Sequence, residues 1–227
     1  MAEKPHYHGH IDRLRERFIK TGINGLQDYE VLELLISYAI RGRDVKPAAK
    51  RLINRFGTLQ GVMNANINEL CKVKGIGRRS AGLIRFVREI IFSYLAEEMI
   101  GADYLESPES VVKFCRSRLA GLKNETFMAI FLDVKNKVLG YDILQEGTID
   151  KTVLFPRKLV EFALAKNASG IILVHNHTSG DIQPSSYDQS LTREIAAALK
   201  PLDIRLLDHL IVGVTGHFSF MDNIFIG

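Results

Sequence analysis

The segment 170–188 (GIILVHNHTSGDIQPSSYD) constrains the fold of this chain more than any other part of the sequence. Its first part, IILVHN at 171–176, is short and mostly apolar, which is typical of a strand buried on both faces. A polar stretch with Gly180 follows, and Pro184-Ser185 is a typical opening of a helix. We therefore expect a strand, a loop and a helix in succession, the unit from which α/β folds are built.

Strand-like and helix-like segments alternate through the whole second half of the chain. Helices are predicted at 106–121, 156–170 and about 186–200, and strands at 125–134, 137–147, 204–214 and 217–221. The first hundred residues show only helical patterns, at 31–38 with Asp28 as the expected cap, at 46–56 and at 78–99. The sequence thus predicts an α/β protein, with a small all-helical domain at 1–102 and a domain with a central mixed β-sheet at 103–227.

Composition places the chain among ordinary globular proteins. Of its 227 residues, 46% are hydrophobic and 25% are charged, so neither a disordered nor a fibrous fold is expected. The sequence has no apolar stretch of about 18 residues that could cross a membrane, and its charged N-terminus lacks the apolar core of a secretory signal. The two cysteines, Cys71 and Cys115, lie far apart, which fits a reducing compartment. We expect a cytoplasmic protein without membrane contact.

Three side chains in segment 170–188 have the spacing of a metal site. His175 and His177 are two residues apart at the end of a predicted strand, so both imidazoles point to the same side. Asp188 follows Ser185 by three residues on the next helix, so these two share a helix face. A catalytic zinc ion accepts two histidines, one aspartate and a water molecule. Ser185 is positioned to donate a hydrogen bond to an oxyanion beside the metal.

Each part of this pattern also has a plainer interpretation. An H-x-H pair is common in proteins that bind no metal, and Ser185-x-x-Asp188 matches a helix capping box with Asp in place of Glu. Asp181 in the loop is a competing ligand, and the same donor set suits manganese or iron. The combination of H-x-H, seven intervening residues and S-x-x-D at a strand-to-helix junction nevertheless favours a metal site.

The string His175-x-His177-x7-Ser185-x-x-Asp188 resembles the JAMM (MPN+) motif of zinc-dependent isopeptidases and peptidases. Segments along almost the whole chain are similar to the bacterial RadC family, named as DNA repair proteins: HGHIDRLRERF, DYEVLELLISYAI, FPRKLVEFALAKNASGIIL, HNHTSGDIQPSSYD and LLDHLIVG. The resemblance implies a JAB/MPN-like α/β domain in which His175, His177 and Asp188 hold one Zn2+ ion. Thr178 replaces the proline of the family's usual HNHPSG, which removes no ligand but is expected to loosen the loop.

The resemblance also implies a general base, a glutamate that takes a proton from the zinc-bound water without binding the metal. In JAMM proteins this residue lies between a helix and the next strand, some tens of residues before H-x-H. Glu125 has that position, 50 residues before His175, whereas Glu146 is a rival that lies closer in sequence. In the implied mechanism, hydroxide attacks an amide or isopeptide carbonyl, and zinc and Ser185 stabilise the tetrahedral oxyanion.

A second motif lies in the first half of the chain, where positive charge is concentrated. Residues 1–100 carry 17 Lys+Arg against 11 Asp+Glu, whereas residues 101–227 carry 13 against 15. The segment 70–84 (LCKVKGIGRRSAGLI) resembles a helix–hairpin–helix, a DNA-binding element without sequence preference. Gly75 and Gly77 let the backbone approach phosphate, and Arg78 and Arg79 add positive charge at a helix N-terminus. The alternative is a tight turn that serves helix packing alone.

Three functions are open at this point. The first is a zinc-dependent metallopeptidase-like or isopeptidase-like hydrolase, associated with DNA and acting on an unidentified protein or peptide. The second is a non-enzymatic DNA-binding or repair-associated protein with a structural metal. The third is a metal-dependent nuclease, which lacks a second carboxylate cluster in this sequence. His6, His8 and His10 lie in a predicted tail and are not expected to form a specific site. Asp208-His209 is interpreted as a structural pair or, at most, as a pair that supports the metal ligands without binding the metal.

Overall fold

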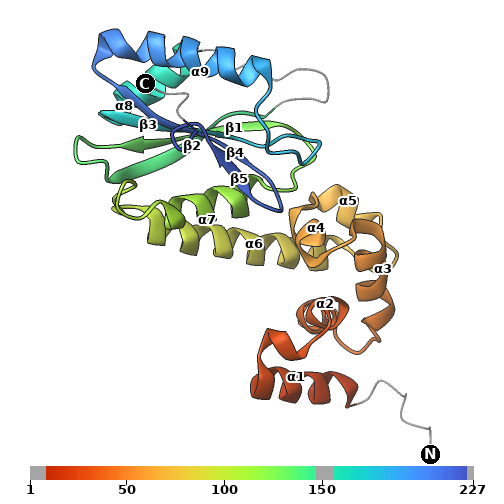
Figure 1. Ribbon diagram of the computed structural model, residues 1–227. Coiled ribbons are helices and arrows are strands. Elements are labelled where there is room, and N and C mark those ends of the chain that lie inside the picture. The colour runs from red at the N-terminus through yellow and green to blue at the C-terminus, as the bar shows by residue number, and fades with distance from the viewer. Residues whose placement is uncertain (1–8, 147–155, 224–227) are drawn as a thin grey trace, which may run out of the picture. The chain divides into compact units, whose positions relative to one another are not determined.

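The computed structural model describes residues 9–146 and 156–223. The chain forms two compact units, Met1–Ile91 and Phe92–Gly227, and each is considered by itself (Figure 1). The division falls within a single helix, whereas the sequence-based boundary at 102/103 lies just beyond that helix. Among the described residues, no helix combines the length and the apolar character needed to cross a membrane.

Short helices make up the described part of the N-terminal unit. They are α1 (His10–Thr21), the 3-10 turn η1 (Ile23–Gly25), α2 (Asp28–Ser37), α3 (Lys46–Phe56), α4 (Leu59–Asn64), α5 (Ile67–Cys71) and the first part of α6 (Arg78–Met99). Their buried faces share one apolar cluster, to which Leu32, Leu52 and Ile84 belong. The helical prediction for this region is confirmed. The helix–hairpin–helix stays a prediction, since α5 spans only five residues.

Helix α2 begins differently from the sequence-based expectation. Gln27, not Asp28, is the residue before the helix, and its backbone N–H donates to the Glu30 carboxylate at 3.0 Å. Asp28 is the first helical residue, and its carboxylate accepts a hydrogen bond from the backbone N–H of Leu59 at 3.4 Å. The prediction of Asp28 as the cap is wrong because this side chain serves a distant segment of the chain.

A five-stranded mixed sheet lies at the centre of the C-terminal unit (Figure 1). In the order β2-β1-β3-β4-β5, its strands are β2 (Val138–Glu146), β1 (Thr126–Leu132), β3 (Gly170–His175), β4 (Arg205–Val212) and β5 (His217–Ser219). Strands β3 and β4 are parallel, and the other neighbours are antiparallel. The parallel pair is connected through a helix, as a parallel crossover requires.

Helices cover both faces of this sheet (Figure 1). They are α7 (Pro108–Leu119) with the end of α6 on one face, and α8 (Pro156–Ala165) with α9 (Ser186–Leu199) and the short η2 (Lys200–Leu202) on the other. Strand β1 is buried on both sides, because Phe127 and Phe131 face α8 and α9 while Met128 and Ile130 face α7. The predicted α/β domain with a central mixed sheet is confirmed.

Alternation along β4 separates Asp208 from its neighbour His209. The buried Asp208 carboxylate accepts hydrogen bonds from the hydroxyls of Tyr104 at 2.6 Å and Ser219 at 2.8 Å. Burial raises the pKa of Asp208, and these hydrogen bonds oppose the rise. The backbone N–H of His209 also donates a hydrogen bond to the Asp208 carboxylate, at 2.7 Å. Asp208 therefore has a structural role. Because successive side chains of a strand point to opposite faces of the sheet, the His209 ring lies on the face opposite to the Asp208 carboxylate.

Candidate metal centre

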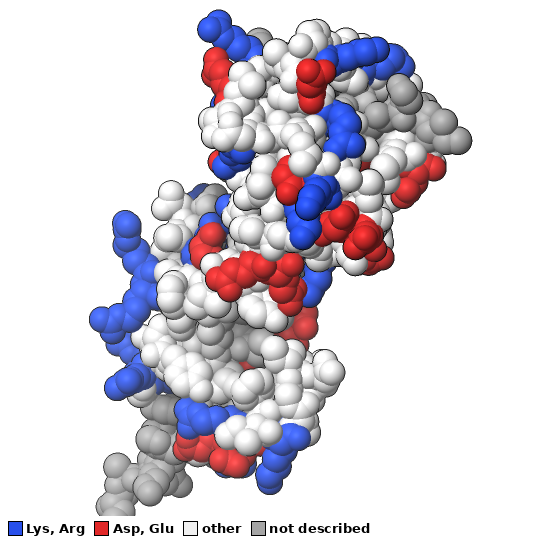
Figure 2. All heavy atoms as spheres, turned by 90° about the vertical axis from the view of Figure 1, so that its left-hand side faces the viewer, with Lys and Arg blue, Asp and Glu red and all other residues white. Residues whose placement is uncertain are grey.

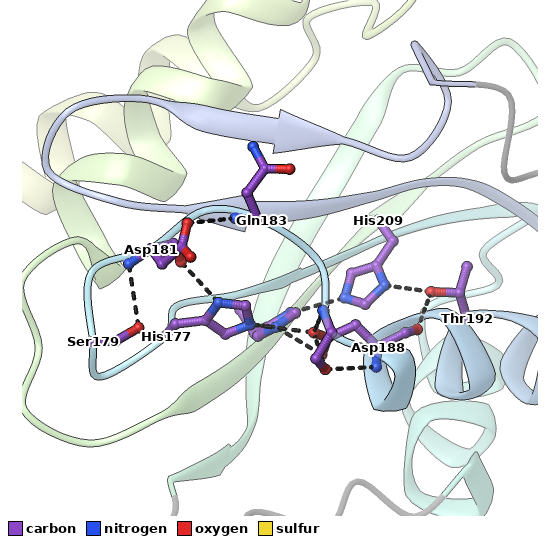
Figure 3. A network of polar contacts seen from close by, with 9 residues as sticks. His177, Ser179, Asp181, Gln183, Asp188, Thr192 and His209 are labelled. Atoms are coloured by element: carbon purple, nitrogen blue, oxygen red, sulfur yellow. Dashed lines mark hydrogen bonds and ion pairs between the residues drawn. The ribbon is translucent and has the colours of Figure 1, made fainter.

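Four residues singled out in the sequence lie together beyond the C-terminal end of β3. Each of Glu125, His175, His177 and Asp188 offers one ligand atom, and these atoms lie within 4.8 Å of one another. His175 Nε2 is 3.0 Å from His177 Nε2 and 3.1 Å from Asp188 Oδ1. His177 Nε2 is 3.3 Å from Asp188 Oδ2 (Figure 3). Ligand atoms bound at roughly 2 Å to one tetrahedral ion have about these separations. The group could therefore hold one metal ion.

The two histidines differ in their access to solvent. His175 is the last residue of β3 and is fully buried, and its ring stacks on Phe127 of β1 at 4.8 Å. His177 lies in the loop that follows, and its side chain is 17% exposed. The group is thus closed by the sheet behind His175 and reaches solvent beside His177.

Asp188 and Ser185 form the reciprocal cap of α9. Asp188 Oδ2 accepts from the Ser185 hydroxyl at 2.6 Å and from the Ser185 backbone N–H at 2.7 Å. Burial alone would raise the pKa of Asp188, but the adjacent imidazoles of His175 and His177 and the hydrogen bond from Ser185 hold that pKa well below its usual range. The capping box and a metal ligand are therefore compatible in one carboxylate. The Ser185 hydroxyl faces Asp188, and its contact with an oxyanion stays a prediction.

Asp181, the competing ligand, has a different position. Its carboxylate accepts from the backbone N–H of Gln183 at 3.0 Å, and its backbone carbonyl lies 2.8 Å from His177 Nδ1 (Figure 3). Its backbone N–H donates to Ser179 Oγ at 3.3 Å. Asp181 thus lies outside the group of four and orients His177 through its carbonyl. Thr178, in the same loop, is exposed.

Glu125 is the base candidate that the structure places with the three candidate ligands. Burial raises the pKa of Glu125, and the neighbouring imidazoles of His175 and His177 oppose that rise. A carboxyl group with a raised pKa suits proton transfer near neutral pH. Its rival Glu146 ends β2, where its Cα is paired with that of Thr126, and its side chain lies outside the described part of the structure.

Asn176, which the sequence analysis did not single out, holds the segment that carries Glu125. Its buried side chain accepts from the backbone N–H of Thr126 at 3.0 Å and donates to the carbonyls of Asn124 at 3.1 Å and Leu122 at 3.4 Å. These bonds fix the backbone on both sides of Glu125. The sequence held one signal for this role, the alternation of side chains along a strand. Because His175 and His177 share one face, the Asn176 side chain between them must point to the opposite face.

The residues predicted to contact DNA lie together in the N-terminal unit, at the start of α6. Gly75, Gly77, Arg78 and Arg79 are all exposed, and Gly75 has a φ of 95°. Ser80 Oγ accepts from the Gly77 backbone N–H at 3.1 Å, so this side chain caps the helix. Exposed glycines and exposed arginines therefore lie side by side in this turn, and their contact with DNA stays a prediction.

Of the three N-terminal histidines, His6 and His8 lie outside the described residues. His10 begins α1, and its Nε2 lies 3.0 Å from Oε1 of the buried Glu33 in α2. His10 therefore takes part in packing between these two helices.

An α/β domain with a buried histidine at the end of β3, a second histidine in the following loop and an aspartate on the next helix fits a metal-dependent hydrolase of the JAMM type. Comparison with family models agrees with this class. A model described as the RadC-like JAB domain matches residues 105–225, and one described as the UPF0758 N-terminal domain matches residues 9–82. The chain therefore belongs to the RadC family, which confirms the resemblance seen in the sequence.

Proposed function

We propose that this protein is a zinc-dependent hydrolase of the JAMM type that cleaves an amide or isopeptide bond in a protein or peptide. The observation that carries the proposal is the group of four, in which two imidazole nitrogens and two carboxylates converge within 4.8 Å. Among the described residues this is the one group of that kind, so a two-metal nuclease has no support there.

The donor set fits zinc, which favours two histidines and a carboxylate in an open, four-coordinate site. When bound, zinc supplies Lewis acidity that lowers the pKa of water and polarises a carbonyl. His175, His177 and Asp188 would hold the ion, and the Glu125 carboxylate would accept a proton from water and then return it to the leaving amine. Ser185 Oγ turns from Asp188 to donate to the developing oxyanion.

Metal content is the first test of this proposal. We expect about one zinc ion per chain by elemental mass spectrometry, because the three ligands form one site. His175→Ala and Asp188→Ala should lose the metal while circular dichroism shows that they remain folded. A folded wild-type protein that takes up no metal, even when zinc is supplied, would contradict the proposal.

Catalysis is tested with Glu125→Gln. This variant should keep its zinc and lose at least about 100-fold in activity, because it removes only the proton acceptor. The probes are a library of internally quenched peptides and a set of ε-linked dipeptides, with wild-type zinc protein as reference. Glu161→Gln is the matched control, since Glu161 is 64% exposed on α8. If His175→Ala unfolds the protein and Glu125→Gln has no effect, the metal is structural.

A second candidate function is DNA binding by the N-terminal unit, favoured by the exposed glycines and arginines at 75–79. Figure 2 shows Lys and Arg side chains along one margin of this unit. The double variant Arg78→Ala/Arg79→Ala should weaken binding to a fluorescent duplex and reduce its salt dependence. Arg157→Ala, a 90% exposed arginine of the other unit, is the control. Equal binding by all three proteins would rule out this contact.

A further inference from the structure

His209 is fully buried on β4, the strand parallel to β3, where its register partner is Leu173, two residues before His175. Its Nε2 is 2.9 Å from His175 Nδ1, and its Nδ1 is 2.7 Å from Thr192 Oγ1 of α9 (Figure 3). Its ring stacks on Phe220 at 4.8 Å. Its Nε2 thus faces an imidazole and its Nδ1 faces a hydroxyl, so a charged ring would be buried without a carboxylate in contact with either nitrogen. The ring is therefore neutral and carries a single N–H.

The backbone carbonyl of Asp188 determines where the protons lie. Thr192 Oγ1 is 2.6 Å from this carbonyl oxygen, which can only accept, so the hydroxyl donates its one proton there. Thr192 Oγ1 must then accept a hydrogen bond from Nδ1–H of His209, which leaves a lone pair on His209 Nε2. That lone pair accepts from Nδ1–H of His175, so the neutral form of His175 has its lone pair on Nε2.

The backbone carbonyl of Asp181 determines the tautomer of His177 in the same way. Asp181 O accepts from His177 Nδ1, so the proton of the neutral ring lies on Nδ1 and the lone pair on Nε2. The Nε2 atoms of His175 and His177 thus face each other at 3.0 Å as two acceptors, beside the Asp188 carboxylate. Three acceptors at this distance repel one another unless a cation lies among them.

We propose that Thr192 and His209 are positioning residues that fix the tautomer and the orientation of His175, so that its Nε2 is free to bind a metal ion. The metal-binding part of this inference rests on the proposed function, whereas the proton assignment does not. Asp188 takes part at both ends, since its backbone carbonyl starts the hydrogen-bonded chain and its carboxylate is a candidate ligand.

The proton assignment is tested by NMR on metal-free protein labelled with 15N-histidine, at mildly alkaline pH. We expect His175, His177 and His209 to show the Nδ1–H tautomer in the wild type. Thr192→Val keeps the shape of the side chain but removes the hydroxyl, so His209 is freed to protonate Nε2 and His175 is then driven to the Nε2–H form. His177 should be unchanged in this variant, because its tautomer depends on Asp181.

The consequence for metal binding is measured by competition with a chromophoric zinc chelator. Thr192→Val should bind zinc about 10- to 100-fold more weakly than the wild type, as expected when the partner of a histidine ligand is lost. Thr192→Ser retains the hydroxyl and should bind like the wild type. Equal weakening in both variants, or Nε2–H on His175 in the wild type, would overturn the inference. A wild type that binds no zinc would refute the proposed function, while the NMR result would still decide the proton assignment.

Discussion

Single buried polar side chains determine the geometry of this protein. Asn176 satisfies three backbone groups next to Glu125, and Thr192 satisfies the carbonyl of Asp188 and the ring of His209. A buried backbone group that loses its partner costs about 1–3 kcal/mol. Substitutions at such positions should therefore affect both stability and the site.

Asn176→Ala tests this at one residue. The variant leaves the buried Thr126 N–H without its acceptor, so we expect the free energy of unfolding to fall by about 2 kcal/mol, measured with urea. The variant should retain zinc but lose activity, because Glu125 is no longer held. Asn124→Ala is the control, since the Asn124 side chain is exposed and only its carbonyl is used. Similar effects of both substitutions would argue against the role of the Asn176 amide.

Glu33 makes the stability of the N-terminal unit dependent on pH. Its side chain is fully buried beside His10, with Lys46 and Asp44 also acting on it, and burial raises the pKa of Glu33 above its ordinary value of 4.5. The stabilising contribution of this group is complete below pH 4.5 and is lost as the pH rises through the raised value.

Glu33→Gln mimics the protonated form, so wild type and variant should be similarly stable at acid pH. Above pH 4.5 the wild type should lose stability relative to the variant, because it must ionise a buried carboxyl. Urea unfolding at a series of pH values measures the difference. A difference that does not change with pH would contradict the prediction.

At the scale of elements, the local sequence pattern was sufficient to predict helices and strands wherever a single hydrophobic periodicity dominates the segment. Helix α3 and helix α6 have the predicted ends, and β3 follows from its apolar run. Local pattern failed where a polar side chain reaches a distant backbone group, as Asp28 does. The contacts of Asn176 and His209 could not be predicted from the sequence either, because they depend on β1 and β4 lying on either side of β3. The four residues of the metal centre could be named, and so could the capping box of Ser185 that holds Asp188. The contacts that hold His175 and Glu125 could not be predicted.

The turn between α5 and α6 offers a test with two glycines, Gly75 and Gly77, that are separated by one residue. Gly75 has a φ of 95°, and a Cβ there would lie 3.2 Å from Ala48 Cβ, whereas a Cβ at Gly77 would meet open space. Gly75→Ala should therefore destabilise the protein by about 1–2 kcal/mol, and Gly77→Ala should change stability little. Thermal unfolding of the two variants measures this. Equal stabilities would show that the turn relaxes without strain.

At the scale of the whole molecule, zinc should stabilise one unit selectively. A ligand at 100 times its dissociation constant adds about 2.7 kcal/mol to the stability of the state that binds it. Hydrogen exchange should therefore slow in β3, β4 and α9 on addition of zinc, while peptides from α3 serve as the internal reference. Asp188→Ala should show no such change. Equal slowing in α3 would contradict a local effect.

The tripeptide 175–177 connects the affinity for the metal ion with the turnover rate, two properties that are usually varied separately. His175 and His177 are candidate metal ligands, and the side chain of Asn176 between them accepts a hydrogen bond from Thr126, the residue after Glu125. We expect an ion with a larger radius to push the two imidazoles apart and thereby to shift the backbone at Asn176, which is hydrogen-bonded to the residue after Glu125. Exchanging zinc for cadmium should then alter the turnover rate as well as the affinity, so the size of the ion becomes a determinant of reactivity.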